Sequence, residues 1–142
     1  MFQSVDLLNC KCLCRSNYAV IGGGHWNLIE TDAESSFIGG GSENFVEGAF
    51  STIGGGSENN VAAGHGVVGG GTLNSCASTA HYCAILGGSE NTGTGNHTTV
   101  AGGGKNMASA TYCTIGGGYL NTAKGLRSTI SGGYNNEVRI FG

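Results

Sequence analysis

The chain has 142 residues, enough for one domain, and it contains 29 glycines, no proline and only 11% charged residues. Its net charge is −3 and its six Lys and Arg residues are scattered, so we expect no nucleic-acid partner. No apolar run approaches the roughly 20 residues of a membrane span, so we expect no membrane partner. The first residues lack the features of a secretory signal, which predicts synthesis and assembly in a cytoplasm with mainly reduced cysteines.

Residues 1–18 precede the repeats that fill the rest of the chain, and we expect them to form an attachment arm or cap. Cys10, Cys12 and Cys14 alternate, a pattern typical of an extended strand with its thiols on one face. Packed free thiols, interchain disulfides and a thiolate metal cluster are three interpretations of this pattern. The residues predicted to dock on a partner are the apolar ones, namely Phe2, Val5, Leu7, Leu8 and Leu13.

Residues 19–142 form the predicted repeat domain. The pattern (Ile/Val)-x-Gly-Gly-x-x-Asn, or a close variant, recurs eight times at intervals of 15 or 17 residues. A fixed register of this kind is typical of stacked coils, in which each repeat buries its apolar edge against its neighbours. The aliphatic core anchors are Ile21, Ile38, Ile53, Val68, Ile85, Val100, Ile115 and Ile130, and the Asn residues six places later are Asn27, Asn44, Asn59, Asn74, Asn91, Asn106, Asn121 and Asn136.

Each repeat is predicted to contain two short strands separated by the glycine turn. The first strand ends at the anchor, with a small residue such as Ser51 or Cys83 two places earlier on the same face. The second strand surrounds the Asn. We therefore predict an all-β, parallel β-solenoid of eight coils about 38 Å tall. Two 17-residue repeats, residues 21–37 and 68–84, are expected to bulge outward at a turn.

The repeated Asn has two interpretations. Stacked Asn side chains can bond to one another and to the backbone of the turn. Alternatively, Asn simply tolerates a left-handed turn conformation. Cys83 and Cys113 share one slot in repeats separated by a third, so their Cα atoms would be about 9–10 Å apart, beyond disulfide reach. We expect both to line the core as small residues.

The repeat resembles the head repeats of trimeric autotransporter adhesins and is similar to repeats in trimeric fibres and decoration proteins of tailed phages. The best matches are residues 51–59, STIGGGSEN, and residues 113–125, CTIGGGYLNTAKG. The resemblance implies a left-handed parallel β-roll in which three chains surround a threefold axis. The adhesin heads usually have Ala or Ser where this chain has Asn, and the sequence shows no heptad stalk or membrane anchor.

A homotrimer is also favoured by the thin core of a single coil stack. The residues two places after each Asn are mostly apolar or small, and we expect this column to lie near the threefold axis. The predicted trimer-interface residues are Ile29, Val46, Val61, Ala108, Ala123 and Val138.

Several outward side chains are candidate ligand-binding groups. His65 and His97 share a slot two coils apart, too far to chelate one metal within a chain, so we expect no metal or cofactor. A column of aromatic residues three places before the anchors either stacks on sugars, together with rings near the turns, or packs across coils or subunits. The column comprises Tyr18, Phe50, Tyr82 and Tyr112, and the rings near the turns are Trp26, Tyr119 and Tyr134. Glu43, Glu58 and Glu90 share a turn position and are expected to be solvated.

Only two Asp residues are present, and no nucleophile, base or phosphate loop has a recognisable spacing, so we expect no enzyme. The predicted function is a structural role on a virion surface, as a trimeric capsid decoration (cement) protein or a fibre segment. The N-terminal arm would dock on another virion protein, such as a capsid protein. The alternative is an adhesin head on a bacterial cell surface that binds a host glycan or a matrix protein.

Overall fold

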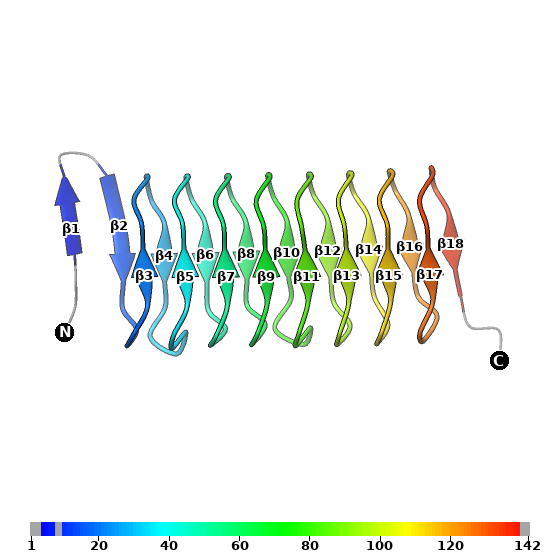
Figure 1. Ribbon diagram of the computed structural model, residues 1–142, viewed down its shortest axis with the longest axis horizontal. Coiled ribbons are helices and arrows are strands. Elements are labelled where there is room, and N and C mark those ends of the chain that lie inside the picture. The colour runs from blue at the N-terminus through cyan, green and yellow to red at the C-terminus, as the bar shows by residue number, and fades with distance from the viewer. Residues whose placement is uncertain (1–3, 8–9, 140–142) are drawn as a thin grey trace.

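The computed structural model describes residues 4–7 and 10–139, which form a parallel β-solenoid of eight coils without any helix (Figure 1). Strands β1 (Ser4–Leu7) and β2 (Cys10–Cys14) form an N-terminal hairpin. Each coil then contributes two strands of two residues. The first strands of the coils are β3 (Val20–Ile21), β5 (Phe37–Ile38), β7 (Thr52–Ile53), β9 (Val67–Val68), β11 (Ala84–Ile85), β13 (Thr99–Val100), β15 (Thr114–Ile115) and β17 (Thr129–Ile130). The second strands are β4 (Leu28–Ile29), β6 (Phe45–Val46), β8 (Asn60–Val61), β10 (Ser75–Cys76), β12 (Thr92–Gly93), β14 (Met107–Ala108), β16 (Thr122–Ala123) and β18 (Glu137–Val138).

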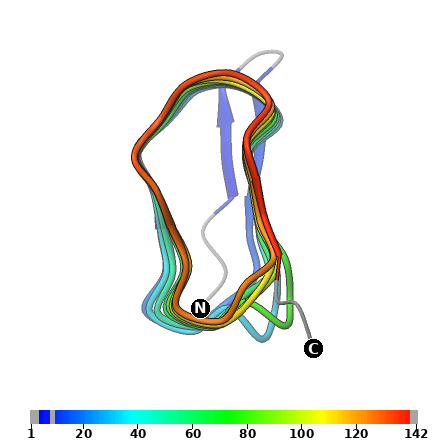
Figure 2. The same cartoon turned by 90° about the vertical axis from the view of Figure 1, so that its right-hand side faces the viewer.

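The strands make two sheets that face each other across a flat coil, and all their strand pairs are parallel except β1 with β2 (Figure 2). The eight-stranded sheet contains every odd-numbered strand from β3 to β17, and anchor pairs with anchor, as Ile38 does with Ile53. The ten-stranded sheet contains β1, β2 and every even-numbered strand from β4 to β18. A third ladder of isolated bridges joins the glycine turns, for example Ser42 to Ser57. Equivalent positions of successive repeats are therefore hydrogen-bonded neighbours in the sheets.

The anchor column is the centre of the core. Six anchors, from Ile38 to Ile115, are fully buried and Ile130 is 6% exposed, whereas Ile21 in the first coil is half-buried. The column two places after each Asn faces the anchors from the other sheet. Ile29, Val46, Val61, Ala108 and Ala123 have no exposed surface in the single chain, and only Val138 in the last coil is 36% exposed.

The expectation that this second column forms the trimer interface is therefore wrong for its buried members. In two-residue strands, the residue directly after the Asn points outward, and the next one points into the coil. A thin coil needs apolar residues from both sheets to fill its interior. Large residues on one side of the coil face small ones on the other. Gly66, for example, faces Val61, and a Cβ on Gly66 would lie only 2.4 Å from a methyl carbon of Val61. The buried members of the column close the core of one chain and have no exposed surface there with which to contact a second subunit.

The repeated Asn forms a continuous buried ladder. All members from Asn27 to Asn121 have no exposed surface. In each of the seven steps the side-chain oxygen of one Asn accepts the backbone N–H of the next, at 3.0–3.1 Å. Each side-chain amide from Asn27 to Asn121 also donates to glycine carbonyls of its own coil and the next, as Asn59 does to Gly55 and Gly71 at 3.1 and 2.9 Å. Of the two interpretations, the ladder is the one observed, because the left-handed residue is the one before the Asn.

The last glycine of each turn allows the coils to approach closely. Gly56 has φ +89, and a Cβ there would lie 2.1 Å from the carbonyl oxygen of Gly71 in the next coil. At Gly55, by contrast, the nearest atom to such a Cβ is 4.0 Å away. Close stacking of the turns thus requires glycine at position 56, whereas position 55 has room for a side chain.

The N-terminal hairpin belongs to the solenoid. β2 pairs in parallel with β4, and Leu13 and Cys14 align with Leu28 and Ile29. Cys12 therefore occupies the Asn slot of a preceding coil, and its sulfur accepts a hydrogen bond from the Asn27 amide at 3.8 Å. Cys12 and Cys14 are half-buried free thiols. Within the segment expected to form an arm or cap, Cys10–Cys14 thus form the second strand of the ten-stranded sheet, after β1, and its first parallel rung.

Candidate functional surfaces

A row of stacked rings runs along the turn opposite the glycine turn. Every residue three places before an anchor has a left-handed conformation, with φ between 54 and 61°, so these side chains project outward in one column. Successive ring centroids are 4.8–5.2 Å apart and the rings are tilted by at most 12°. The Arg127 guanidinium continues the row, 6.0 Å from the ring of Tyr112. The rings belong to Phe50, His65, Tyr82, His97 and Tyr112.

This geometry decides between the two interpretations of the aromatic column. Rings that stack along the rod cover one another's faces, although Phe50, Tyr82 and Tyr112 remain 51–53% exposed. A sugar stacks on a ring face, so the inner rings of this row offer it no platform. The row packs across coils instead. The His residues are members of it, which their shared slot in the repeat could have indicated.

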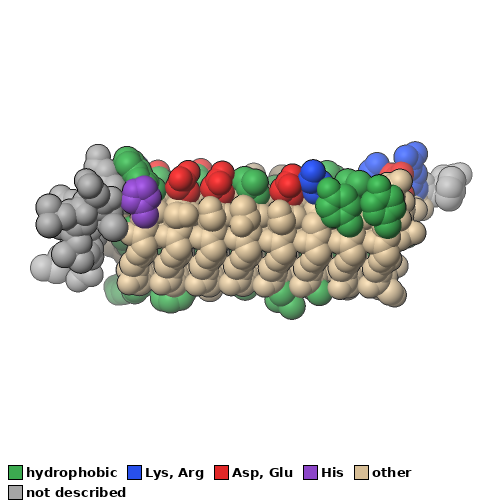
Figure 3. All heavy atoms as spheres, turned by 90° about the horizontal axis from the view of Figure 1, so that it is seen from above, with side chains coloured by type: hydrophobic (Ala, Val, Ile, Leu, Met, Phe, Trp, Pro, Cys, Tyr) green, Lys and Arg blue, Asp and Glu red, His purple; other side chains and the backbone are tan. Residues whose placement is uncertain are grey.

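A second outward row follows the glycine turn, on the side seen in Figure 3. Its residues, five places after each anchor, are also left-handed, with φ between 54 and 59°. They include Glu43, Glu58 and Glu90, and Lys105 lies 3.7 Å from Glu90. A hydrogen bond to Tyr119 and the nearby Glu90 carboxylate raise the pKa of Lys105. The described residues contain no group of three or more His, Cys, Asp or Glu arranged to hold a metal ion.

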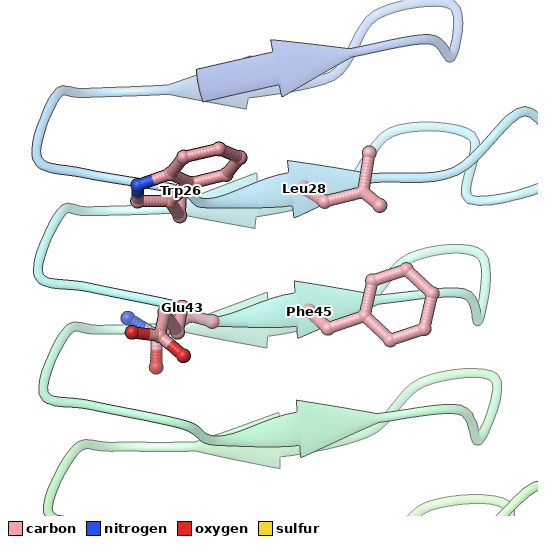
Figure 4. A pocket seen from close by; sticks show the side chains of 5 residues that line it. Trp26, Leu28, Glu43 and Phe45 are labelled. Atoms are coloured by element: carbon pink, nitrogen blue, oxygen red, sulfur yellow. The ribbon is translucent and has the colours of Figure 1, made fainter. Parts of the chain in front are cut away.

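A shallow pocket lies at the start of this row, in the first two coils (Figure 4). Trp26 and Glu43 hold the same turn position in consecutive coils, and Leu28 and Phe45 pair on β4 and β6. Buried Asn44 lies beneath them. Trp26 is 52% exposed. Sequence patterns could not identify this pocket, because its members fall in two different columns.

The outer face of the eight-stranded sheet is flat and uncharged. Six of its eight outward residues are Val or Thr, whose short branched side chains suit a regular sheet surface. Its larger apolar members, Val20, Phe37 and Val67, are 39–53% exposed. The remaining outward residues are Thr52, Ala84, Thr99, Thr114 and Thr129.

Cys76 and Cys83 form a disulfide across the coil, with their Cα atoms 5.9 Å apart. The expectation that Cys83 is a free core residue is therefore wrong. The two cysteines flank the longer turn of the second 17-residue repeat. Cys76 lies two places after an Asn and Cys83 two places before the next anchor, and these two positions face each other across the coil. A Cβ on Gly93 would lie 2.5 Å from the Cys83 sulfur, so glycine makes room for the bond. Cys113 is a buried free thiol, 3.1 Å from the Gly125 carbonyl.

The predicted docking residues are only partly described. Phe2 and Leu8 lie outside the described residues, and Val5 and Leu7 lie in β1. Leu13 is 36% exposed on β2, in register with Leu28. Leu13 therefore extends the apolar strip that leads to the pocket.

Within residues 4–7 and 10–139 we find no helix long and apolar enough to cross a lipid bilayer. The sequence matches no model of a known protein family, and no curated protein is significantly similar to it.

Proposed function

We propose that the chain is a non-enzymatic structural rod on a virion surface, either a trimeric capsid decoration (cement) protein or a fibre segment. The observation that carries this proposal is the uninterrupted stack of eight coils, held together by the Asn ladder. A stack of this kind makes a stiff spacer, because each coil contacts only its neighbours and no hinge interrupts the ladders. The hairpin end, including Leu13, would dock on another virion protein.

Three left-handed rolls around a threefold axis are the assembly that the adhesin-like repeat implies. With the post-Asn column buried, the outer face of the eight-stranded sheet is the best candidate for the contact. It is uncharged along its whole length, and rods with the same coil spacing can match each other rung by rung. The Cys76–Cys83 disulfide suits a protein that serves outside a reducing cytoplasm.

Two measurements test this proposal. Sedimentation equilibrium should give three times the chain mass, and Val67→Lys should shift the distribution to monomers because it buries an unpaired charge in the contact. Thr122→Lys on the opposite sheet is the control and should stay trimeric. A monomeric wild-type protein at micromolar concentration would reject the trimer.

The location is tested by density-gradient sedimentation of particles from a producing culture. The chain should travel with intact virions, and Leu13→Glu should release it. Recovery with the bacterial envelope would instead favour the second candidate, an adhesin head on a bacterial cell surface. The specific observation behind that candidate is the pocket in the first two coils, near the N-terminal end of the rod.

A further inference from the structure

We infer that the pocket formed by Trp26, Leu28, Glu43 and Phe45 is a binding site for one neutral hexose unit of a glycan. This inference deepens the second candidate function and depends on it for its biological setting. Its chemistry concerns only the described residues of the first two coils.

The four side chains form a square on the rod surface. Trp26 and Glu43 lie on adjacent coils, and the Glu43 N–H donates to the carbonyl of His25 at 2.9 Å. Leu28 and Phe45 form the other side, in parallel register. Neighbouring rungs of a sheet are about 4.8 Å apart. One pyranose ring is wide enough to contact side chains on both rungs.

The square is held rigidly, which favours binding without a cost of ordering. Trp26 and Glu43 both have the fixed left-handed turn conformation, with φ 58 and 57°. Beneath them, the amide of Asn44 donates to Asn27 at 3.1 Å and to Gly40 and Gly56 at 3.0 and 2.9 Å. Figure 4 shows Trp26 and Glu43 on adjacent coils at one side of the site, and Leu28 and Phe45 on the same two coils at the other side.

The lining determines the chemistry of the ligand. The rings and Leu28 offer apolar contact, as the C–H face of a pyranose requires. The Glu43 carboxylate has two acceptor oxygens, which suit two neighbouring hydroxyl groups. No Lys or Arg lines the pocket, and Glu58 follows Glu43 in the next coil, so an anionic sugar would be repelled.

This combination occurs once among the eight coils. At the same two positions, the other coils have Glu58 with Asn60, Leu73 with Ser75, Glu90 with Thr92, Lys105 with Met107, Leu120 with Thr122, and Asn135 with Glu137. None of these pairs includes an aromatic ring. The site therefore departs from the repeat, as a binding site on a regular scaffold must.

The test uses the fact that Trp26 is the only tryptophan of the chain. The full-length protein is titrated with lactose and with maltotriose while the tryptophan emission is recorded. We expect a saturable change for at least one sugar, with a dissociation constant on the order of 1 mM. Glu43→Gln should weaken binding about tenfold, because the acceptor loses its charge. Glu90→Gln, at the same position in another coil, is the matched control and should bind like the wild type.

Choline serves as the competing probe, because a ring beside a carboxylate also suits a quaternary ammonium ion. Saturation with choline but with neither sugar would overturn the inference in favour of a cation site. A saturable sugar response that Glu43→Gln and Glu90→Gln leave equally strong would also overturn it, as would no response to any probe. These outcomes are independent of where the protein is found in the cell, so a failed site and a failed adhesin function can be told apart.

Discussion

The two turns of each coil differ in how strictly their length is kept. From the anchor to the Asn, all eight repeats have the same six-residue step across the glycine turn. From the Asn to the next anchor, the step is nine residues in five cases and eleven in two. The glycine turn carries the buried Asn ladder and carbonyl contacts that exclude even a Cβ. The opposite turn carries exposed rings, and both longer turns protrude there (Figure 2). The number of residues is thus constant in the glycine turn, where side chains and backbone of adjacent coils are in close contact.

The strongest test of this comparison is an insertion of two residues. A Thr-Asp insertion between Gly55 and Gly56 should destabilise the fold by more than about 4 kcal/mol, because it breaks the ladder and the turn stacking at once. The same insertion after Glu47, copying residues 31–32, should lower the free energy of unfolding by less than about 1 kcal/mol. Thermal unfolding followed by circular dichroism measures both. Equal losses would show that the two turns do not differ in this way.

Gly56→Ala should cost about 3 kcal/mol or more, because the new Cβ meets a carbonyl oxygen that belongs to the backbone of the next coil. The neighbouring Gly55→Ala is the control and should change stability by less than about 1 kcal/mol, since its Cβ enters open space. Urea unfolding gives the two free energies. A stable Gly56→Ala protein would mean that the turns can move apart cheaply.

Asn59→Ala should cost about 2–3 kcal/mol, because it removes the acceptor of the buried Asn74 N–H and the amide that donates to the Gly55 carbonyl. Asn60→Ala is a matched control one residue away. Its side chain is only half-buried and its oxygen has no hydrogen-bond partner, so we expect a change within about 0.5 kcal/mol. The difference in urea midpoint between the two variants measures the ladder, and identical midpoints would contradict it.

Reduction of the Cys76–Cys83 disulfide should cost about 2 kcal/mol, because the bond closes only a short loop in the opposite turn. Melting temperatures with and without a thiol reductant measure the effect. Cys76→Ala should melt at the same temperature in both conditions, since it has no bond to lose. A wild-type protein that is insensitive to complete reduction would show that the longer turn needs no covalent support.

The smallest effect concerns the last coil. Hydrogen bonds from Arg139 and Lys124 lower the pKa of Glu137 from 4.5 to about 2. The folded state therefore binds this proton more weakly than the unfolded state, so the stabilisation is present above about pH 4.5 and is lost as the pH falls towards 2. Glu137→Gln should melt slightly below the wild type at pH 6, and the gap should close at pH 2. A gap that persists at pH 2 would assign the effect to something other than charge.

The repeat made much of the fold predictable. Two short strands per coil follow from the anchor and the Asn, and the two bulges follow from the 17-residue spacing. The buried columns were harder to place. In strands of two residues, alternation gives each coil one inward residue per strand, and sequence does not reveal whether an apolar column such as Val46 and Val61 faces its own core or a neighbour. Burial of both columns reflects how thin the coil is.

The candidate sites were less predictable, for a related reason. The shared slot of Phe50, His65, Tyr82 and His97 was visible in the sequence, but only the left-handed backbone aligns their rings face to face. The pocket combines Trp26 and Glu43 from one column with Leu28 and Phe45 from another, so no single period contains it.

The sequence by itself determined the coil number, the parallel register and the need for glycine and Asn at the turn, because each depends on contacts that recur at a fixed spacing. Only the tertiary structure decided which faces remain outside, that Cys76 meets Cys83, and that the hairpin is a rung of the sheet. These features depend on how the coil closes across its interior and at its ends. A period along the chain reports which residues stack, but it does not report what lies opposite them.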